Sequence, residues 1–288
     1  MFGNAMRPVS SLGLCLVFYS GLSLAPLWGH AQEDVPGSEP LAFEVGPGSF
    51  PIGGDLAEID LPEDFLFLGA EASQEFMERT ENPVGGNEVA TLLPASEEAG
   101  WFVILEWDEI GYVDDEEADL DADALLDSIR DGTEAANEIR RERGWSTMQI
   151  VGWREAPFYD PATQNLTWSI IGESEGDQNV NRMIKLLGRR GVMTATLVAG
   201  PEELDAAAAR TDELLAAYRF RPGSRYAEFV PGQDRLAEIG LAALVAGGAG
   251  AALAKTGLLA RFWKLIVGGL VAAGAGLSRL FRRTRPEV

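Results

Sequence analysis

Short runs of apolar residues follow one another through the middle of the chain, as β-strands do. In Ala57–Leu61 apolar and acidic residues alternate, which is typical of a strand with one buried face. The run Trp101–Leu105 is β-branched and aromatic throughout, which indicates a buried strand. Further strands are predicted at Val89–Leu93, Met148–Trp153, Leu166–Ile171, Asn179–Leu187 and Gly191–Val198.

Three segments carry apolar residues at helical spacing instead. The clearest is Asp121–Arg143, in which Leu125 and Ile129 share one face. Its aspartates lie at the start and its arginines at the end, which suits the helix dipole. A second amphipathic helix is predicted at Glu202–Tyr218 and a short one at Ala70–Arg79. Consecutive strands with grouped helices predict the α+β class, an antiparallel sheet packed with two main helices.

Turn-forming residues lie between these elements. Gly188–Gly191 is predicted as a tight hairpin turn, and Pro157–Pro161 as the loop between two strands. Residues 32–54 are rich in Gly, Pro and Glu with little periodicity, which predicts a linker. Residues 55–235 are therefore predicted to form the soluble acidic domain.

The chain changes character at residues 236–288, which are rich in glycine and alanine and end in a basic run, Arg282-Arg283-Thr284-Arg285. Ile239–Ala254 offers 16 uncharged residues and Leu265–Ser278 offers 14, whereas one helical crossing of a bilayer takes about 20. We expect a membrane anchor, either a helical hairpin or one membrane helix with its neighbour in the interface. The alternative is a soluble pair of apolar helices docked on the domain.

The first 31 residues resemble an export signal. Arg7 supplies the positive start, an apolar stretch follows, and Gly29-His30-Ala31 offers the small residues that signal peptidase reads. The alternative is an uncleaved anchor.

The number of membrane crossings by the tail stays open. An exported domain whose basic C-terminus lies in the cytoplasm needs an odd number of crossings. A helical hairpin instead places the C-terminus on the outside.

Charge restricts the partners. The chain has a formal net charge of −22, and residues 32–235 carry 15 basic against 43 acidic residues. Such a surface repels nucleic-acid phosphates and anionic lipid headgroups, so we expect no nucleic-acid partner and a domain that stands off the membrane. Small residues four apart, such as Ala243 and Gly247, favour helix–helix contact in the tail.

The residue inventory excludes several chemistries. The one cysteine, Cys15, and the one histidine, His30, both lie in the segment predicted to be removed. A mature domain without them has no disulfide framework, cysteine nucleophile, histidine base or Cys/His zinc site. We therefore expect no metal and no cofactor.

Two acidic features are candidate sites. The run from Asp114 to Asp123 suggests a calcium loop, but counting from Asp119 puts Ala124 and Arg130 where glycine and glutamate are needed. A solvated loop and helix start is the preferred interpretation. Asp160, on the loop predicted at 157–161, is the best single catalytic candidate, and its alternative role is turn formation.

Several blocks of residues resemble a bacterial family of predicted membrane-anchored proteins, domain of unknown function (DUF) 2167. The resemblance covers roughly residues 55–262 and departs from the family pattern at Gln164, where histidine is frequent. The family name implies an exported, anchored domain with no established activity or site residues. The blocks are Leu61–Phe65, Gly111–Asp115, Asn137–Arg140, Val151–Trp153, Pro157–Asp160, Leu187–Gly191 and Ala242–Gly248.

We accordingly expect an inner-membrane protein of the bacterial envelope whose acidic domain faces the periplasm. The favoured function is a non-catalytic binding or assembly module, with the bilayer as one partner and an envelope protein or a second copy as another. The alternative is a carboxylate-dependent hydrolase of envelope glycans or peptides, which requires at least two acids gathered in one place.

Overall fold

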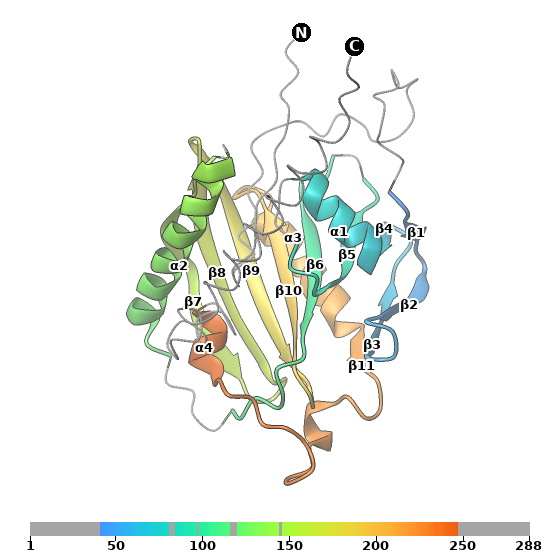
Figure 1. Cartoon of the computed structure of the whole chain (residues 1–288). Helices are drawn as coiled ribbons and strands as arrows, with labels where there is room; N and C mark the ends of the chain where they lie inside the picture. Colours follow the sequence, from blue (N-terminus) through green and yellow to red (C-terminus); the bar gives the residue numbers. More distant parts are fainter. Residues whose placement is uncertain (1–40, 81–83, 97, 116–119, 144–145, 247–288) are drawn as a thin grey trace, which may run out of the picture.

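The computed structural model describes residues 41–80, 84–96, 98–115, 120–143 and 146–246 (Figure 1). Two antiparallel sheets dominate this part of the chain. The large sheet has eight strands in the order β1-β4-β5-β6-β10-β9-β8-β7, and the small sheet has the order β11-β3-β2. The large-sheet strands are β1 (Glu44–Val45), β4 (Phe65–Gly69), β5 (Glu88–Pro94), β6 (Phe102–Asp108), β10 (Val192–Ala199), β9 (Asp177–Leu187), β8 (Asn165–Ser174) and β7 (Gln149–Asp160); the small-sheet strands are β11 (Tyr218–Phe220), β3 (Ala57–Leu61) and β2 (Gly48–Ile52).

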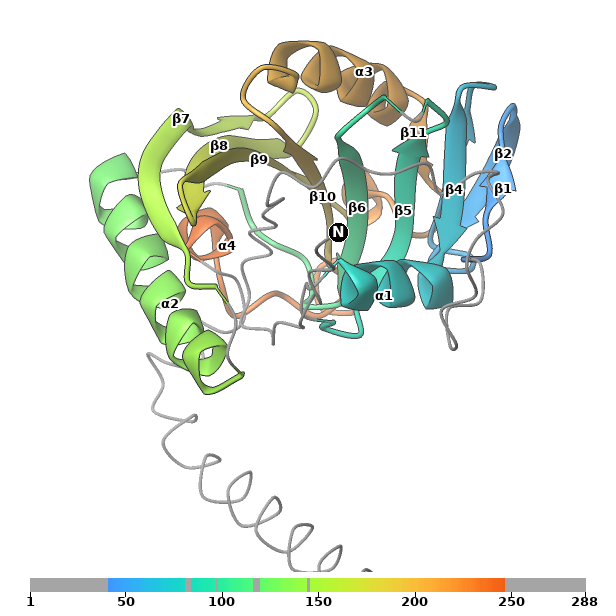
Figure 2. The ribbon, with the colours of Figure 1, turned by 90° about the horizontal axis from the view of Figure 1, so that it is seen from above.

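The helices lie on both faces of the large sheet. Helix α3 (Leu204–Ala216) lies on one face, whereas α1 (Ala70–Arg79), α2 (Ala122–Arg143) and α4 (Leu241–Val245) lie on the other (Figure 2). A single 3-10 turn, η1 (Tyr226–Glu228), lies on the chain between β11 and α4. The domain is therefore layered, with the large sheet in the middle.

Alternation along the strands divides the core in two. On the α3 face, Leu105 of β6 and Leu197 of β10 pack in one cluster with Ile59 of the small sheet and Leu214 of α3. On the opposite face, one cluster joins α2 and α4 to the strands β7–β10, and another joins α1 to β4, β6 and β10. Because both faces are covered, β10 in the centre of the sheet is buried along its whole length.

The predicted fold class is confirmed in its main feature, a large antiparallel sheet with helices. Each predicted strand from Ala57–Leu61 to Gly191–Val198 overlaps an observed strand, and each predicted helix an observed helix. The predicted hairpin turn is also observed, since the Gly188 N–H donates to the Gly191 carbonyl at 2.9 Å between β9 and β10. Local patterning thus located the elements well.

Two predicted loops are wrong in part. The segment 157–160 is the end of β7 rather than a loop. Proline is tolerated there because β7 is an edge strand, whose outward N–H groups need no partner, and the pairing with β8 is irregular between Glu155 and Phe158. The predicted linker 32–54 also contains β1 and β2, which pairing with distant strands stabilises despite their glycines and proline.

The boundary predicted at residue 235 falls inside the packed structure. Leu236 bridges to Tyr112, and the Ala237 N–H donates to the Tyr112 carbonyl at 2.7 Å. In α4, Leu241 and Val245 are fully buried in the same cluster as α2. The first residues assigned to the membrane tail are therefore part of the domain core.

Within the ranges that the structure describes, no helix is long and apolar enough to cross a membrane. The predicted signal segment 1–31 and the rest of the tail, 247–288, lie outside those ranges.

Candidate functional site

Four polar side chains lie side by side on neighbouring strands of the large sheet. Lys185 of β9 pairs with Thr194 of β10, Thr194 pairs with Glu106 of β6, and Glu106 pairs with Glu88 of β5. We call these four residues the polar row. Lys185, Thr194 and Glu106 lie on the face that carries α1, α2 and α4, because their strand neighbours Met183, Val192 and Ile104 belong to the apolar clusters under those helices. Glu88 joins them through its pairing with Glu106, next to a register shift in β5.

The polar row is buried. Lys185 and Glu106 are each 8% exposed, Thr194 is 4% exposed and Glu88 is 1% exposed. The Lys185 Nζ donates a hydrogen bond to the Thr194 Oγ1 at 2.7 Å. The Glu88 carboxylate accepts the backbone N–H groups of two turn glycines, Gly85 at 2.5 Å and Gly86 at 2.8 Å. A buried charge costs much free energy without such partners.

A second row runs beside the first on the same face. Trp168, Met183, Thr196, Ile104 and Thr91 pair successively across β8, β9, β10, β6 and β5. The Trp168 Nε1 and the Thr91 Oγ1 are buried and have no hydrogen-bond partner among the described residues. Buried polar atoms usually have a partner, so these two groups mark a polar environment that the described part of the chain leaves incomplete.

The polar row brings one ammonium group and two carboxylates into a desolvated environment. Such groups can hold ionic groups of a ligand or transfer protons, because electrostatic interactions are stronger away from water. None of these four residues is among the site residues predicted from the sequence. The sequence nevertheless contains two features that mark them: Glu106 is an acid within an apolar strand, and Lys185 is the one lysine between residues 32 and 235.

A cluster of tyrosines lies around Asp115. The Tyr159 hydroxyl donates to the Asp115 Oδ2 at 2.5 Å, and the Tyr226 hydroxyl donates to the Val113 carbonyl at 2.9 Å. The Tyr112 ring stacks on Tyr226, with centroids 4.4 Å apart. This cluster joins the segment after β6, the end of β7 and η1, which are distant in sequence.

Two tyrosines of this cluster, Tyr159 and Tyr226, have a raised pKa and stay protonated near neutral pH. Burial, followed by the hydrogen bond to Asp115, raises the pKa of Tyr159 well above its usual value. Burial also raises the pKa of Tyr226, with further contributions from Tyr112 and Asp115. A phenol with a raised pKa carries almost no phenolate near neutral pH, so neither group is ionised to act as a base there. The contacts of the cluster clamp three segments together.

Asp160, the predicted catalytic candidate, forms a turn. Its Oδ1 accepts the Ala162 N–H and its Oδ2 accepts the Thr163 hydroxyl, both at 2.9 Å. Gln164 completes the turn in a left-handed conformation with φ of 54°, and its Nε2 donates to the Pro161 carbonyl at 2.7 Å. These are the contacts of an Asx-type turn.

The acidic run from Asp114 to Asp123 is only partly described, because residues 116–119 lie outside the described ranges. Asp115 accepts the Tyr159 hydroxyl, and the Asp121 Oδ1 accepts the Ala124 N–H at 3.1 Å at the start of α2. The role at a helix start is thus observed for Asp121. Across the described residues, no group of three His, Cys, Asp or Glu side chains is arranged to hold a metal ion.

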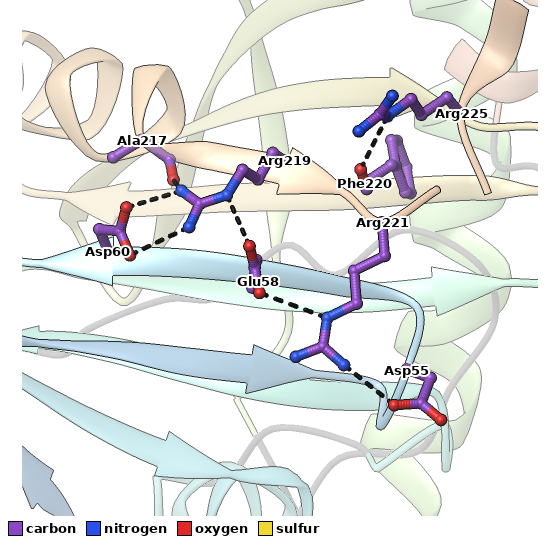
Figure 3. A network of polar contacts seen from close by, with 8 residues as sticks. All are labelled: Asp55, Glu58, Asp60, Ala217, Arg219, Phe220, Arg221 and Arg225. Atoms are coloured by element: carbon purple, nitrogen blue, oxygen red, sulfur yellow. Dashed lines mark hydrogen bonds and ion pairs between the residues drawn. The ribbon is translucent and has the colours of Figure 1, made fainter. Parts of the chain in front are cut away.

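An exposed ion-pair network ties β11 to β3 (Figure 3). The Arg219 guanidinium contacts Glu58 and Asp60, each at 2.6 Å, and Arg221 contacts Asp55 at 2.9 Å and Glu58 at 3.3 Å. The hydrogen bond from Arg219, with a second from Ser49, lowers the pKa of Asp60. These arginines are occupied by acids of the same domain, so the network is structural.

The sequence model of the family described as "Protein of unknown function (DUF2167)" matches residues 44–277, most of the chain. The chain belongs to the DUF2167 family. The solution structure of cyanobacterial PsbP (CyanoP) from Synechocystis sp. PCC 6803 is similar with a TM-score of 0.37 and 9% identity, over 68% of this chain and 100% of that one. No curated protein sequence matches.

Three of the sequence blocks on which the family resemblance rests meet at the tyrosine cluster. Tyr112 and Asp115 come from the block 111–115, and Tyr159 comes from the block 157–160. The block 187–191 joins them, because the Gly111 N–H donates to the Arg190 carbonyl at 2.9 Å. The blocks therefore coincide with the contacts that hold this end of the domain together.

Proposed function

We propose that this protein is a membrane-anchored component of the bacterial envelope. Its acidic domain, exported to the periplasmic side of the inner membrane, serves as a non-catalytic binding or assembly module. The tail beyond residue 246 is the anchor, and the partner is an envelope protein with a basic surface or a second copy held through the tail.

One observation carries this proposal: the acidic residues are placed on the outside. Of the acids in the described ranges, the buried ones are Glu88 and Glu106. On α2, three exposed aspartates follow one another at intervals of four residues, Asp123, Asp127 and Asp131. Like charges at this spacing destabilise a helix by roughly 0.2–0.5 kcal/mol per pair. A surface that retains them suits recognition of a basic partner.

The packing of α4 supports close attachment to the membrane. The chain stays in contact with the domain core as far as Val245, which is fully buried. An anchor that starts at residue 247 leaves almost no linker. This proposal therefore holds the domain at the membrane surface and replaces the expectation, drawn from its acidity, that it stands off the membrane.

Truncation tests the anchor. A chain ending at Ala246 keeps α4 and is expected in the soluble fraction, whereas the full chain stays with membranes after alkaline washing. If the chain ending at Ala246 also stays with washed membranes, the tail is not the anchor.

Charge-matched variants test the binding surface. Chemical cross-linking in cells is expected to trap a complex of the unsubstituted full chain with its partner, and the α2 variant D123N/D127N/D131N is expected to lose that complex. Added salt should also weaken the complex. The control E71Q/E75Q/E78Q changes the same amount of charge on exposed positions of α1. Equal loss in both variants would show that net charge, not α2, drives association.

A carboxylate-dependent hydrolase is the second candidate, favoured by the buried pair Glu88 and Glu106, which face each other across β5 and β6. Its test is the release of fragments from purified peptidoglycan, measured by mass spectrometry. An activity that E106Q abolishes while the fold is retained would favour the hydrolase over the binding module.

A further inference from the structure

Lys185 is an unusual residue in this domain. Residues 32–235 contain 15 basic residues, and Lys185 is the one lysine among them. The cations of the ion pairs in the described ranges are arginines, whose side chains are 17% to 52% exposed. Lys185 lies in the middle of the large sheet instead, and it is 8% exposed.

The Lys185 ammonium group is under-coordinated for a buried cation. It has three N–H donors, and the hydrogen bond to the Thr194 hydroxyl is its one polar contact with the described chain. No ion pair of the described residues includes it. A buried ammonium without a counter-charge is unfavourable, so an anionic group is the natural complement.

A second buried donor lies on the same face of the adjacent strand. Trp168 of β8 pairs with Met183, two positions from Lys185 on β9. Its Nε1 is buried and has no hydrogen-bond partner within the part of the chain that the structure describes. Diagonal neighbours of this kind are about 7–8 Å apart at their Cα atoms. Two long side chains at that spacing can reach one small group between them.

We propose that Lys185 and Trp168 form a binding site for a small molecule bearing a carboxylate. One carboxylate oxygen accepts the Lys185 Nζ–H and the other accepts the Trp168 Nε1–H. This site is separate from the exposed acids of the proposed recognition surface.

Glu106 sets the charge that this site accepts. It lies on β6, two strands from Lys185, with Thr194 between them. Its carboxylate repels a second negative charge on the ligand. The site therefore favours a singly charged carboxylate over phosphate, which carries more charge near neutral pH.

Lysine-selective NMR measures this site directly. The full chain contains three lysines, Lys185, Lys255 and Lys264. With 13C at the ε-carbon, the detergent-solubilised full chain gives three groups of signals, and the K185R variant assigns the one from Lys185. Acetate and inorganic phosphate serve as the probes. Acetate is expected to shift the Lys185 signal with saturation, and phosphate is expected to shift it less. Neither probe is expected to cause such a shift in the signals of Lys255 and Lys264.

Variants separate the contributions. K185M removes the charge at similar size, and W168F removes one donor; each is expected to weaken acetate binding about tenfold to a hundredfold, as loss of a charge-assisted hydrogen bond does. T211V makes the same type of substitution at a buried threonine of α3, on the opposite face of the large sheet, and should retain binding. E106Q should raise the response to phosphate. Binding by the variants is followed through thermal stabilisation by acetate.

The proposal fails if the Lys185 signal does not move with acetate while the protein stays folded by near-ultraviolet circular dichroism. It also fails if acetate stabilises the wild type and K185M equally. Should K185M not fold, W168F and T211V decide, since equal loss of acetate binding in both would contradict the assignment of the donors.

Discussion

Replacing a leucine of α4 tests whether the start of the tail belongs to the domain. Leu244 is 3% exposed and packs in the cluster that joins α2 and α4 to the large sheet. The substitution L244A removes that side chain without changing charge. The membrane segment predicted from the sequence begins at Ile239, so the same residue would face lipid if that prediction held.

The magnitude follows from burial. A buried leucine replaced by alanine costs about 2–5 kcal/mol, because both the transfer free energy and the contacts around the cavity are lost. For a domain of this size, that corresponds to a fall in Tm of at least about 4 °C. Leu236 provides the matched control, since it is 57% exposed and undergoes the same change. L236A is expected to change the free energy of unfolding by no more than about 0.5 kcal/mol.

Thermal unfolding of the two variants and the wild type, followed by tryptophan fluorescence in the same mild detergent, measures the difference. L244A should unfold at a clearly lower temperature than L236A. If the two variants unfold together within error, α4 is not part of the core and the packing argument is wrong.

The remaining predictions concern the acids of the domain. Y159F removes the hydrogen bond to Asp115 and should lower the free energy of unfolding by about 1.5–3 kcal/mol in denaturant titrations, whereas no loss would contradict a clamp. D160A should cost about 1 kcal/mol of stability as a lost turn contact, and a loss of partner binding at unchanged stability would restore a functional role. Hydrogen bonds from Arg189 and the Val230 N–H lower the pKa of Asp234, so this group stabilises the fold above its ordinary pKa of about 3.9 and loses that effect as pH falls below it. D234N should accordingly be less stable than wild type at neutral pH and approach it in acid; a constant difference from pH 7 to pH 3 would refute the coupling.

Much of the fold could be predicted from local pattern. The alternation in Ala57–Leu61 and the helical spacing in Asp121–Arg143 each depend on residues close in sequence, and both elements are observed. The sequence predicts a loop at 157–160 because proline normally interrupts a strand. Proline is acceptable in β7 only because this strand lies at the edge of the sheet.

The candidate site was not predicted, because its members come from four strands. Glu88 and Lys185 are far apart in the sequence and share a row only through the order β5-β6-β10-β9. Asp160 was the preferred candidate on the assumption that it lay on a loop, and its oxygens instead close a turn.

The sequence by itself determined the acidity of the domain, the positions of most strands and helices, and the absence of cysteine and histidine between residues 32 and 288. Those properties are fixed by composition or by neighbours along the chain. Tertiary structure alone decided that Lys185 lies buried beside Thr194 and that Leu241 and Val245 pack on α2 rather than continue as a free tail. Burial and pairing depend on which distant segments meet, and no local pattern of residues contains that information.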